Sequence, residues 1–164
     1  MSRALLSLGS NLAPEDNLSS AVRALRERFG HVQLSPVYRT AAVGFEGGDF
    51  LNAGALIETA MTPQQLNDWL HALEDRHARD RSGPRFGDRT LDIDIVLFDD
   101  LVLEGPGHLQ LPRDDLRHAF VLKPLWDIAP GYVEPRSGKS LAELWAGSPE
   151  RDVVMAEVEG LDLD

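Results

Sequence analysis

The stretch at residues 50–73, FLNAGALIETAMTPQQLNDWLHAL, predicts a strand followed at once by a helix. Residues 50–59 form an apolar run that favours a strand. A helix start is then marked by Thr62, Pro63 and Gln65. Threonine can cap the first turn, proline suits the first helical position, and a glutamine three residues after the cap can accept the backbone N–H of the capping residue. The buried face of this helix is expected to carry Leu66, Trp69, Leu70 and Leu73.

The neighbouring segments predict the same alternation of strands and helices. Residues 4–10 read as a buried strand entering the turn Gly9-Ser10-Asn11, and a helix from Pro14 to Gly30 follows it. Residues 32–39 and 93–98 read as further strands. The order strand, helix, strand, strand, helix, strand is typical of an α+β, ferredoxin-like split βαβ core, in which helices pack on one face of an antiparallel sheet.

The remainder of the chain predicts a C-terminal helical extension. An apolar run at residues 120–126 favours one helix, and residues 141–145 favour a shorter one. Residues 147–164 carry six acids and one arginine, so we expect an acidic and poorly ordered tail. We interpret residues 1–164 as a single domain, because a chain of this length can bury a sizeable core.

The amino-acid composition indicates which kinds of molecule the protein can bind. The chain is 43% hydrophobic and 26% charged, as globular proteins are, and its lack of cysteine excludes disulfides and thiolate metal sites. The 27 acidic and 16 basic residues give a net charge of -11, which repels nucleic acid. No stretch approaches the length of about 18 apolar residues that a membrane span needs. We therefore expect a cytoplasmic monomer with small-molecule partners, neither nucleic acid nor membrane.

Arginine is concentrated in one segment of this acidic chain. Between His71 and Thr90 lie five of these residues, Arg76, Arg79, Arg81, Arg85 and Arg89. Ser82-Gly83-Pro84 and Gly87 interrupt any periodic pattern there, so residues 76–89 are expected to form a mobile loop. Such a cluster favours a local anion site. The alternative is a solvated surface of mixed charge.

Two aspartates lie two residues apart on the last predicted strand. The side chains of Asp92 and Asp94 should share one face, while Ile93, Ile95 and Leu97 face the other way. Neighbouring carboxylates suit Mg²⁺, which takes one or two protein carboxylates together with water and substrate phosphates. In the structural alternative, each aspartate pairs with an arginine of the preceding segment. Because neither a P-loop nor a Gly-x-Gly-x-x-Gly pattern is present, we expect metal, arginine and loop groups to hold any nucleotide.

Several blocks of the chain match, in order, the motifs of one known family: Leu8-Gly9-Ser10-Asn11-Leu12, Tyr38-Arg39-Thr40, Phe50-Leu51-Asn52, Arg89-Thr90-Leu91-Asp92-Ile93-Asp94, and Leu111-Pro112 with Phe120-Val121-Leu122-x-Pro124-Leu125. With these blocks the chain resembles 6-hydroxymethyl-7,8-dihydropterin pyrophosphokinase of folate biosynthesis over residues 4–130. The Arg-Thr-Leu-Asp-x-Asp segment is the most specific of them.

The resemblance implies that the β- and γ-phosphates of ATP pass together to the hydroxymethyl oxygen of the pterin, with release of AMP. It implies two Mg²⁺ ions held by Asp92 and Asp94. The implied catalytic residues are Arg79, Arg89, Asp92 and Asp94. The implied ATP-binding residues are Glu74, Arg79, Arg81, Arg85, Arg89, Ile95 and Arg113.

The resemblance also implies a pterin site. Phe50 and Phe120 match the two stacking positions of the family, Asn52 and Thr40 match polar pterin contacts, and Val43 matches a backbone contact. Judged by residue type alone, the two phenylalanines read more readily as core residues than as ligand contacts. Only the family pattern favours stacking on a ligand.

The chain departs from the family pattern around the nucleotide and the loops. Ala41 and Ala42 replace prolines, Phe86 replaces a tryptophan, Arg113 replaces a histidine, and residues 116–120 are one residue short. These departures leave open a paralog that acts on a related pterin. They also leave open a binding module without turnover, and an interaction domain on which Asp92 and Asp94 are mere surface charges.

Overall fold

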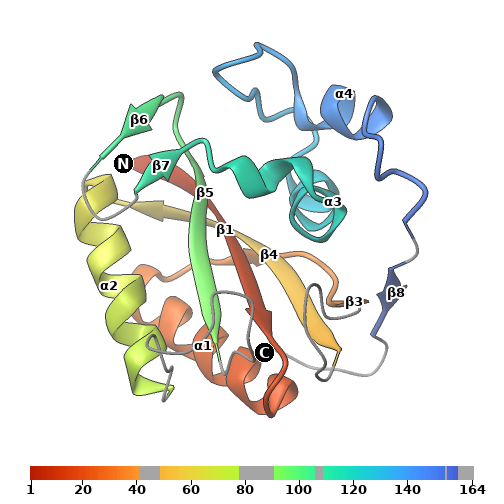
Figure 1. Ribbon diagram of the computed structural model, residues 1–164. Coiled ribbons are helices and arrows are strands. Elements are labelled where there is room, and N and C mark those ends of the chain that lie inside the picture. Colours follow the sequence, from red (N-terminus) through yellow and green to blue (C-terminus); the bar gives the residue numbers. More distant parts are fainter. Residues whose placement is uncertain (41–48, 78–90, 106–108, 154, 159–164) are drawn as a thin grey trace.

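The computed structural model describes residues 1–40, 49–77, 91–105, 109–153 and 155–158 (Figure 1). Its elements, in chain order, are β1 (Ser2–Ser10), α1 (Pro14–Phe29), β2 (Gln33–Leu34), β3 (Tyr38–Thr40), β4 (Phe50–Thr59), α2 (Pro63–Arg76), β5 (Asp92–Phe98), β6 (Leu103–Glu104), β7 (Gln110–Leu111), the 3-10 helix η2 (Asp114–Arg117), α3 (Ala119–Ile128), α4 (Leu141–Ala146) and β8 (Ala156–Glu157). None of the helices in the described ranges is both long and apolar enough to cross a membrane.

The main sheet has the strand order β5-β1-β4-β3-β8, and β2 also pairs with β4. Every pairing in it is antiparallel. The first strand therefore lies between the last strand of the core and β4, which is the arrangement of a split βαβ fold. The predicted ferredoxin-like core is confirmed. In the segment that was expected to form the acidic tail, Ala156–Glu157 form β8, which pairs with β3 at the edge of the sheet.

Helices cover both faces of this sheet (Figure 1). On one face, here called the α1/α2 face, residues such as Leu6, Leu18 and Leu70 form one buried cluster. On the opposite face, the α3 face, Leu5 and Leu125 belong to a second cluster with α3 and α4. The two helices of the core lie on one face as predicted, and the predicted C-terminal helical extension folds back and buries the second face.

A β-bulge interrupts the predicted alternation of side chains between the two faces of β5. Leu6 pairs with Ile95 and Leu5 pairs with Leu97, so Val96 is an extra residue without a partner on β1. As a result, Leu97 packs in the α3-face cluster, whereas Ile93 and Ile95 pack in the α1/α2-face cluster. The prediction that Leu97 faces the same way as these isoleucines was wrong, but Asp92 and Asp94 precede the bulge and do share one face.

The strand predicted at residues 32–39 is interrupted. Ser35 leaves the ladder, donates its backbone N–H to the carbonyl of Gly54 at 2.9 Å and accepts the Gly54 N–H on Oγ at 2.8 Å. Pro36 then has no N–H to donate. The segment therefore forms two short strands, β2 and β3, on the same side of β4.

The predicted helix ends are confirmed, with one change at α2. Thr62 and Gln65 form the capping box that begins α2, and Gly30 ends α1. Because α2 continues through Arg76, the arginine-rich segment starts inside a helix rather than in a loop. The predicted turn after the first strand also starts later, since Gly9 and Ser10 still pair with β4.

Candidate functional site

The register of four strands collects polar side chains in one row on the α3 face. Asp92 of β5 pairs with Gly9 of β1, Gly9 pairs with Asn52 of β4, and Asn52 pairs with Tyr38 of β3. Directly paired residues of antiparallel strands point to the same face. The predicted metal ligand Asp92 and the predicted pterin contact Asn52 therefore lie in one row, separated by Gly9.

The next row on the same face carries the second aspartate. Asp94 pairs with Ser7, and Ser7 pairs with Gly54. On the opposite side of the first row, Phe50 pairs with Thr40. The predicted metal and pterin residues of the described segments thus occupy adjacent rows of one face, although they come from three strands.

Gly9 makes room for the site, a role that the sequence patterns did not predict. A Cβ atom at Gly9 would lie 3.0 Å from Oδ1 of Asn52 and 3.9 Å from Cδ1 of Phe50. The first of these separations is closer than side chains normally tolerate. Gly9 therefore lets the Asn52 side chain lie over β1, toward the aspartates. The Leu8-Gly9-Ser10 block was the signal that could have revealed this.

Asn52 and Thr40 form one polar unit. Asn52 Nδ2 donates to Thr40 Oγ1 at 2.7 Å, and Asn52 is buried. This hydrogen bond orients the Asn52 amide and leaves its Oδ1 beside Gly9. The two residues predicted as polar pterin contacts are therefore brought together. Phe50, at the end of the same ladder, is half-buried, which suits an aromatic surface for a ligand.

The two aspartates lie in an environment that disfavours negative charge. Burial and the neighbouring carboxylate of Asp92 raise the pKa of Asp94 above its ordinary range, and Glu74 and Asp115 act in the same direction. Arg113 opposes this effect, with its Nη1 3.8 Å from Asp94 Oδ1. The ionised form of Asp94 is therefore disfavoured here, and a bound cation would stabilise it.

Arg113 connects η2 to the aspartates. Its backbone N–H donates to the carbonyl of Val96 at 3.1 Å, next to the bulge, and its Nη2 donates to Asp115 at 3.4 Å. Its Nε is buried and finds no acceptor among the described residues. The predicted ATP-binding arginine is thus held beside Asp94.

Glu74 and Ile95, two of the predicted ATP-binding residues, are both buried. Glu74 is only 2% exposed, and its Oε2 accepts the backbone N–H of Ile93 at 3.0 Å. This bond ties α2 to the peptide between the two aspartates. Ile95 is 2% exposed and packs in the α1/α2-face cluster, so its side chain does not reach the α3 face.

Phe120 lies in the first turn of α3 and is half-buried against the α3-face cluster. The ring of His118 stacks on it, with centroids 5.4 Å apart and planes inclined by 12°. Glu150 holds this helix start, since its Oε1 accepts the Ala119 N–H at 3.2 Å and its Oε2 lies 3.0 Å from His118 Nδ1. Arg117 is exposed. The shortened segment therefore places a histidine ring, rather than an arginine, against the predicted pterin-stacking side chain.

Helix α3 crosses the sheet from β5 toward β3. Its approach starts at Arg113 beside β5, and a contact at Gly54 fixes the helix over β4. A Cβ atom at Gly54 would lie 2.8 Å from Leu125 Cδ2 and 3.2 Å from the carbonyl carbon of Pro124. Only glycine allows the helix to lie this close to the strand.

Part of the predicted site lies outside the described residues. These positions are the arginines Arg79, Arg81, Arg85 and Arg89, the backbone contact Val43, and the departures Ala41, Ala42 and Phe86.

The described residues fit a magnesium site of limited protein coordination. They contain no group of three or more His, Cys, Asp or Glu side chains arranged to hold a metal ion. Asp92 and Asp94 supply two adjacent carboxylates on one face of β5. Mg²⁺ is commonly held in this way, by one or two carboxylates with the rest of its shell from water and phosphate oxygens.

Comparison with known proteins identifies one family. A model of 7,8-dihydro-6-hydroxymethylpterin-pyrophosphokinase (HPPK) matches residues 5–130. The 2-amino-4-hydroxy-6-hydroxymethyldihydropteridine pyrophosphokinase of Pseudomonas aeruginosa is 39% identical over 153 residues, covering 90% of this chain and 92% of that protein. The enzyme of the same name from Synechocystis is 35% identical over 145 residues, covering 86% and 73%.

Solved structures share the fold. The wild-type HPPK-DHPS of Plasmodium falciparum superposes with a TM-score of 0.66 at 14% identity and covers 92% of this chain. This chain spans only 45% of that protein, so the match concerns one part of a longer polypeptide.

Proposed function

Since the chain belongs to the 7,8-dihydro-6-hydroxymethylpterin-pyrophosphokinase family, we propose that the α3 face of its sheet is the site where this family's reaction takes place. The chain is an ATP-dependent pyrophosphokinase that transfers pyrophosphate from ATP to the hydroxymethyldihydropterin in folate biosynthesis. One observation carries the proposed location: strand register aligns Asp92 with Asn52 across Gly9.

The pterin is proposed to lie over Asn52, with Phe50 and Phe120 on its two faces. A flat heteroaromatic ring needs an apolar, aromatic surface and a few polar groups that read its edge. Asn52 supplies an amide, already oriented by Thr40. The remaining oxygen of that amide lies beside Gly9, in the row that leads to Asp92.

The triphosphate is proposed to lie along β5, near Asp92, Asp94 and Arg113. Mg²⁺ bound there supplies positive charge to the transferring phosphate group, which is what this class of reaction mainly requires. Asp92 and Asp94 hold two ions in the proposal, and the Arg113 guanidinium beside Asp94 donates to a phosphate oxygen. Arg79 and Arg89 are assigned to the phosphates on the family pattern.

In the transfer itself, the hydroxymethyl oxygen of the pterin bonds to the β-phosphorus of ATP while the bond from that phosphorus to the α-phosphate oxygen breaks. AMP leaves with that oxygen, and the hydroxyl proton passes to solvent or to a nearby base. The chain contributes alignment. Asn52 orients the pterin that accepts the pyrophosphate, and Asp92 and Asp94 would hold the positively charged metal ions. Positioning of this kind accounts for much of the catalysis of phosphoryl transfer.

The products and the bound metal together test this proposal. We expect the protein, incubated with ATP, Mg²⁺ and 6-hydroxymethyl-7,8-dihydropterin, to release AMP. Titration of Mn²⁺ in the presence of a non-hydrolysable ATP analogue should show binding that Asp92→Asn weakens and that Asp100→Asn, on the exposed turn after β5, does not change. Release of ADP, or equal metal binding in both variants, would contradict the assignment.

The chain is further proposed to act as a monomer. Among the described residues, few large apolar side chains are exposed: Met1, Leu12, Leu101, Val102, Val133 and Val153. Stable oligomers usually bury a contiguous apolar patch. Sedimentation at micromolar concentration is expected to give the mass of one chain, 18.1 kDa, and a mass twice as large would contradict this.

A further inference from the structure

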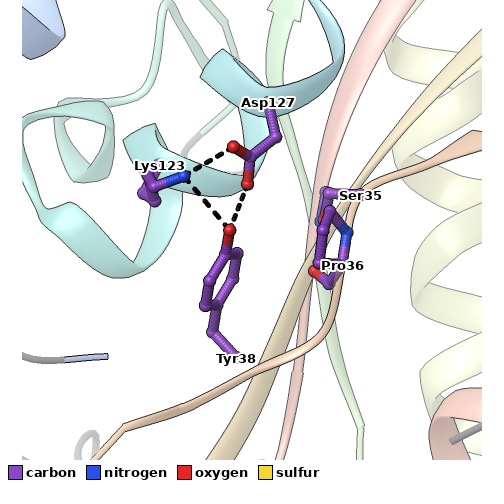
Figure 2. Close-up of polar contacts among 6 residues, drawn as sticks. Ser35, Pro36, Tyr38, Lys123 and Asp127 are labelled. Atoms are coloured by element: carbon purple, nitrogen blue, oxygen red, sulfur yellow. Dashed lines mark hydrogen bonds and ion pairs between the residues drawn. The ribbon is translucent and has the colours of Figure 1, made fainter. Parts of the chain in front are cut away.

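A partly buried polar cluster ties α3 to the edge strand β3, next to the proposed pterin site. The Tyr38 hydroxyl donates to Asp127 Oδ2, and Lys123 Nζ donates to Asp127 Oδ1 at 2.6 Å and to the Tyr38 oxygen at 3.2 Å. Figure 2 shows the three side chains converging, two from the helix and one from the strand. We call these three residues the Tyr38 clamp.

The clamp is shielded from solvent and its charges are balanced. Tyr38 is 6% exposed, and the side chains of Asp127 and Lys123 are 14% and 24% exposed. Burial and Asp127 raise the pKa of Tyr38, so the hydroxyl remains a donor at neutral pH. The Lys123 ammonium also lies 4.4 Å from the centre of the Trp126 ring. A shielded cluster with every charge paired is rigid, because any displacement leaves a group without its partner.

Both elements joined by the clamp also carry proposed pterin-binding residues. On α3, Phe120, Lys123 and Asp127 are spaced by three and four residues, which places them on one side of the helix. On β3, Tyr38 and Thr40 are two residues apart and share a face, and Thr40 holds Asn52. The clamp therefore connects the element bearing one aromatic contact to the element that orients the amide.

The apolar contact and the clamp constrain the helix in different ways. Packing of Leu125 and Pro124 on Gly54 limits how closely α3 approaches the sheet. Apolar contact is non-directional, however, whereas hydrogen bonds are directional. At a helix radius of about 5–6 Å, a rotation of roughly 10° moves a side-chain position by about 1 Å. A misplacement of about 1 Å is enough to reduce catalysis on the order of 100-fold.

We propose that Tyr38, Lys123 and Asp127 are positioning residues that set the rotation of α3 and thereby hold Phe120 at stacking distance over the pterin. The inference rests on the proposed pterin site. Tyr38 and its partners touch no substrate; they act through Phe120 and through the β3 segment that carries Thr40.

Tyr38→Phe is the central test, because it keeps the ring and removes the hydroxyl. We expect the KM for the pterin to rise about tenfold while the KM for ATP changes less than twofold. Tyr132→Phe is the matched control, since the Tyr132 hydroxyl also donates to a residue distant in the sequence, in its case the backbone carbonyl of Asp99 at 2.7 Å. Its pterin KM should stay within twofold of the unmodified protein. Equal KM values for Tyr38→Phe and Tyr132→Phe would overturn the proposal.

A second variant separates positioning from loss of fold. Asp127→Ala removes both acceptor oxygens of the clamp, and the double variant Tyr38→Phe/Asp127→Ala should weaken pterin binding no more than Asp127→Ala alone. Titration calorimetry in the absence of ATP measures the pterin affinity of each variant. Melting temperatures recorded alongside show whether a variant is less stable, so that a loss of affinity can be separated from a loss of fold. Independent, multiplicative effects of the two changes would contradict a shared role. AMP formation by the unmodified protein, measured first, shows whether any failure belongs to this inference or to the proposed function.

Discussion

The α1/α2 face and the α3 face of the sheet are built from the same strands but carry different chemistry. On β4, Leu51, Ala53 and Ala55 enter the α1/α2-face core, while Asn52 and Gly54 alternate with them and point to the α3 face. On β5, Ile93 faces the core between Asp92 and Asp94. Since side chains alternate along a strand, one face stabilises the fold while the other remains free to hold polar groups.

The two faces also differ in how their helices are attached. Helices α1 and α2 pack through buried leucines and form a continuous apolar layer. Helix α3 combines apolar packing with a polar clamp and with close approach at a glycine. Apolar packing tolerates small shifts, whereas a binding site needs a defined geometry. The functional face therefore adds a cluster of charged, directional contacts to its apolar packing, whereas the α1/α2 face relies mainly on buried leucines.

The largest expected effect of a single substitution is on the α3 face. Asp94→Ala should lower kcat by a factor on the order of 1,000 or more, because removal of a metal ligand loses stabilisation of charge in the transition state. The melting temperature should change little, since the replaced group is a carboxylate crowded by Asp92. Steady-state kinetics and thermal unfolding without added metal check both parts. A variant that keeps normal turnover would place the metal elsewhere.

On the α1/α2 face we expect the reverse result. Leu70→Ala removes a fully buried side chain and should lower the free energy of unfolding by about 2–5 kcal/mol, while kcat of the folded protein stays unchanged. Urea unfolding measures the first effect, and activity at low temperature measures the second. Leu101→Ala, at a position 39% exposed, is the control and should change stability by less than about 0.5 kcal/mol. A large loss of kcat in Leu70→Ala would show that the faces are not separable.

The smallest of the three effects is expected at the contact between α3 and β4. Gly54→Ala places a Cβ atom 2.8 Å from Leu125 and should cost about 1–3 kcal/mol, because the helix must shift outward. The shift should also raise the KM for the pterin severalfold. Gly131→Ala serves as the control, since no atom lies within 4 Å of its added Cβ. Identical pterin KM values in the two variants would indicate that α3 moves without affecting the site.

Local patterns predicted most of the secondary structure. The capping box at Thr62, the proline at the start of α1 and the apolar runs of β1, β4 and β5 are signals contained within a few neighbouring residues. The pairing of Asp92 and Asp94 on one face followed from the two-residue period of a strand. The roles of Arg79, Arg81, Arg85, Arg89 and Val43 stay predictions.

The sequence missed features that depend on a partner distant in the chain. The bulge at Val96 is visible only in the register against β1, and it moves Leu97 to the other face. The break at Ser35 depends on Gly54, which lies 19 residues away. No pattern within either segment contains this information, because the acceptor or the steric limit belongs to another strand.

By itself, the sequence determined the alternation of strands and helices, the acidic pair on β5 and, through its motifs, the family. Only the tertiary structure decided that the C-terminal helix covers the second face, that Gly9 opens the space between Asp92 and Asn52, and that Tyr38, Lys123 and Asp127 meet. The reason is physical. Periodicity and capping act over a few residues, whereas register and close packing arise only when segments nearly ninety residues apart are brought into contact.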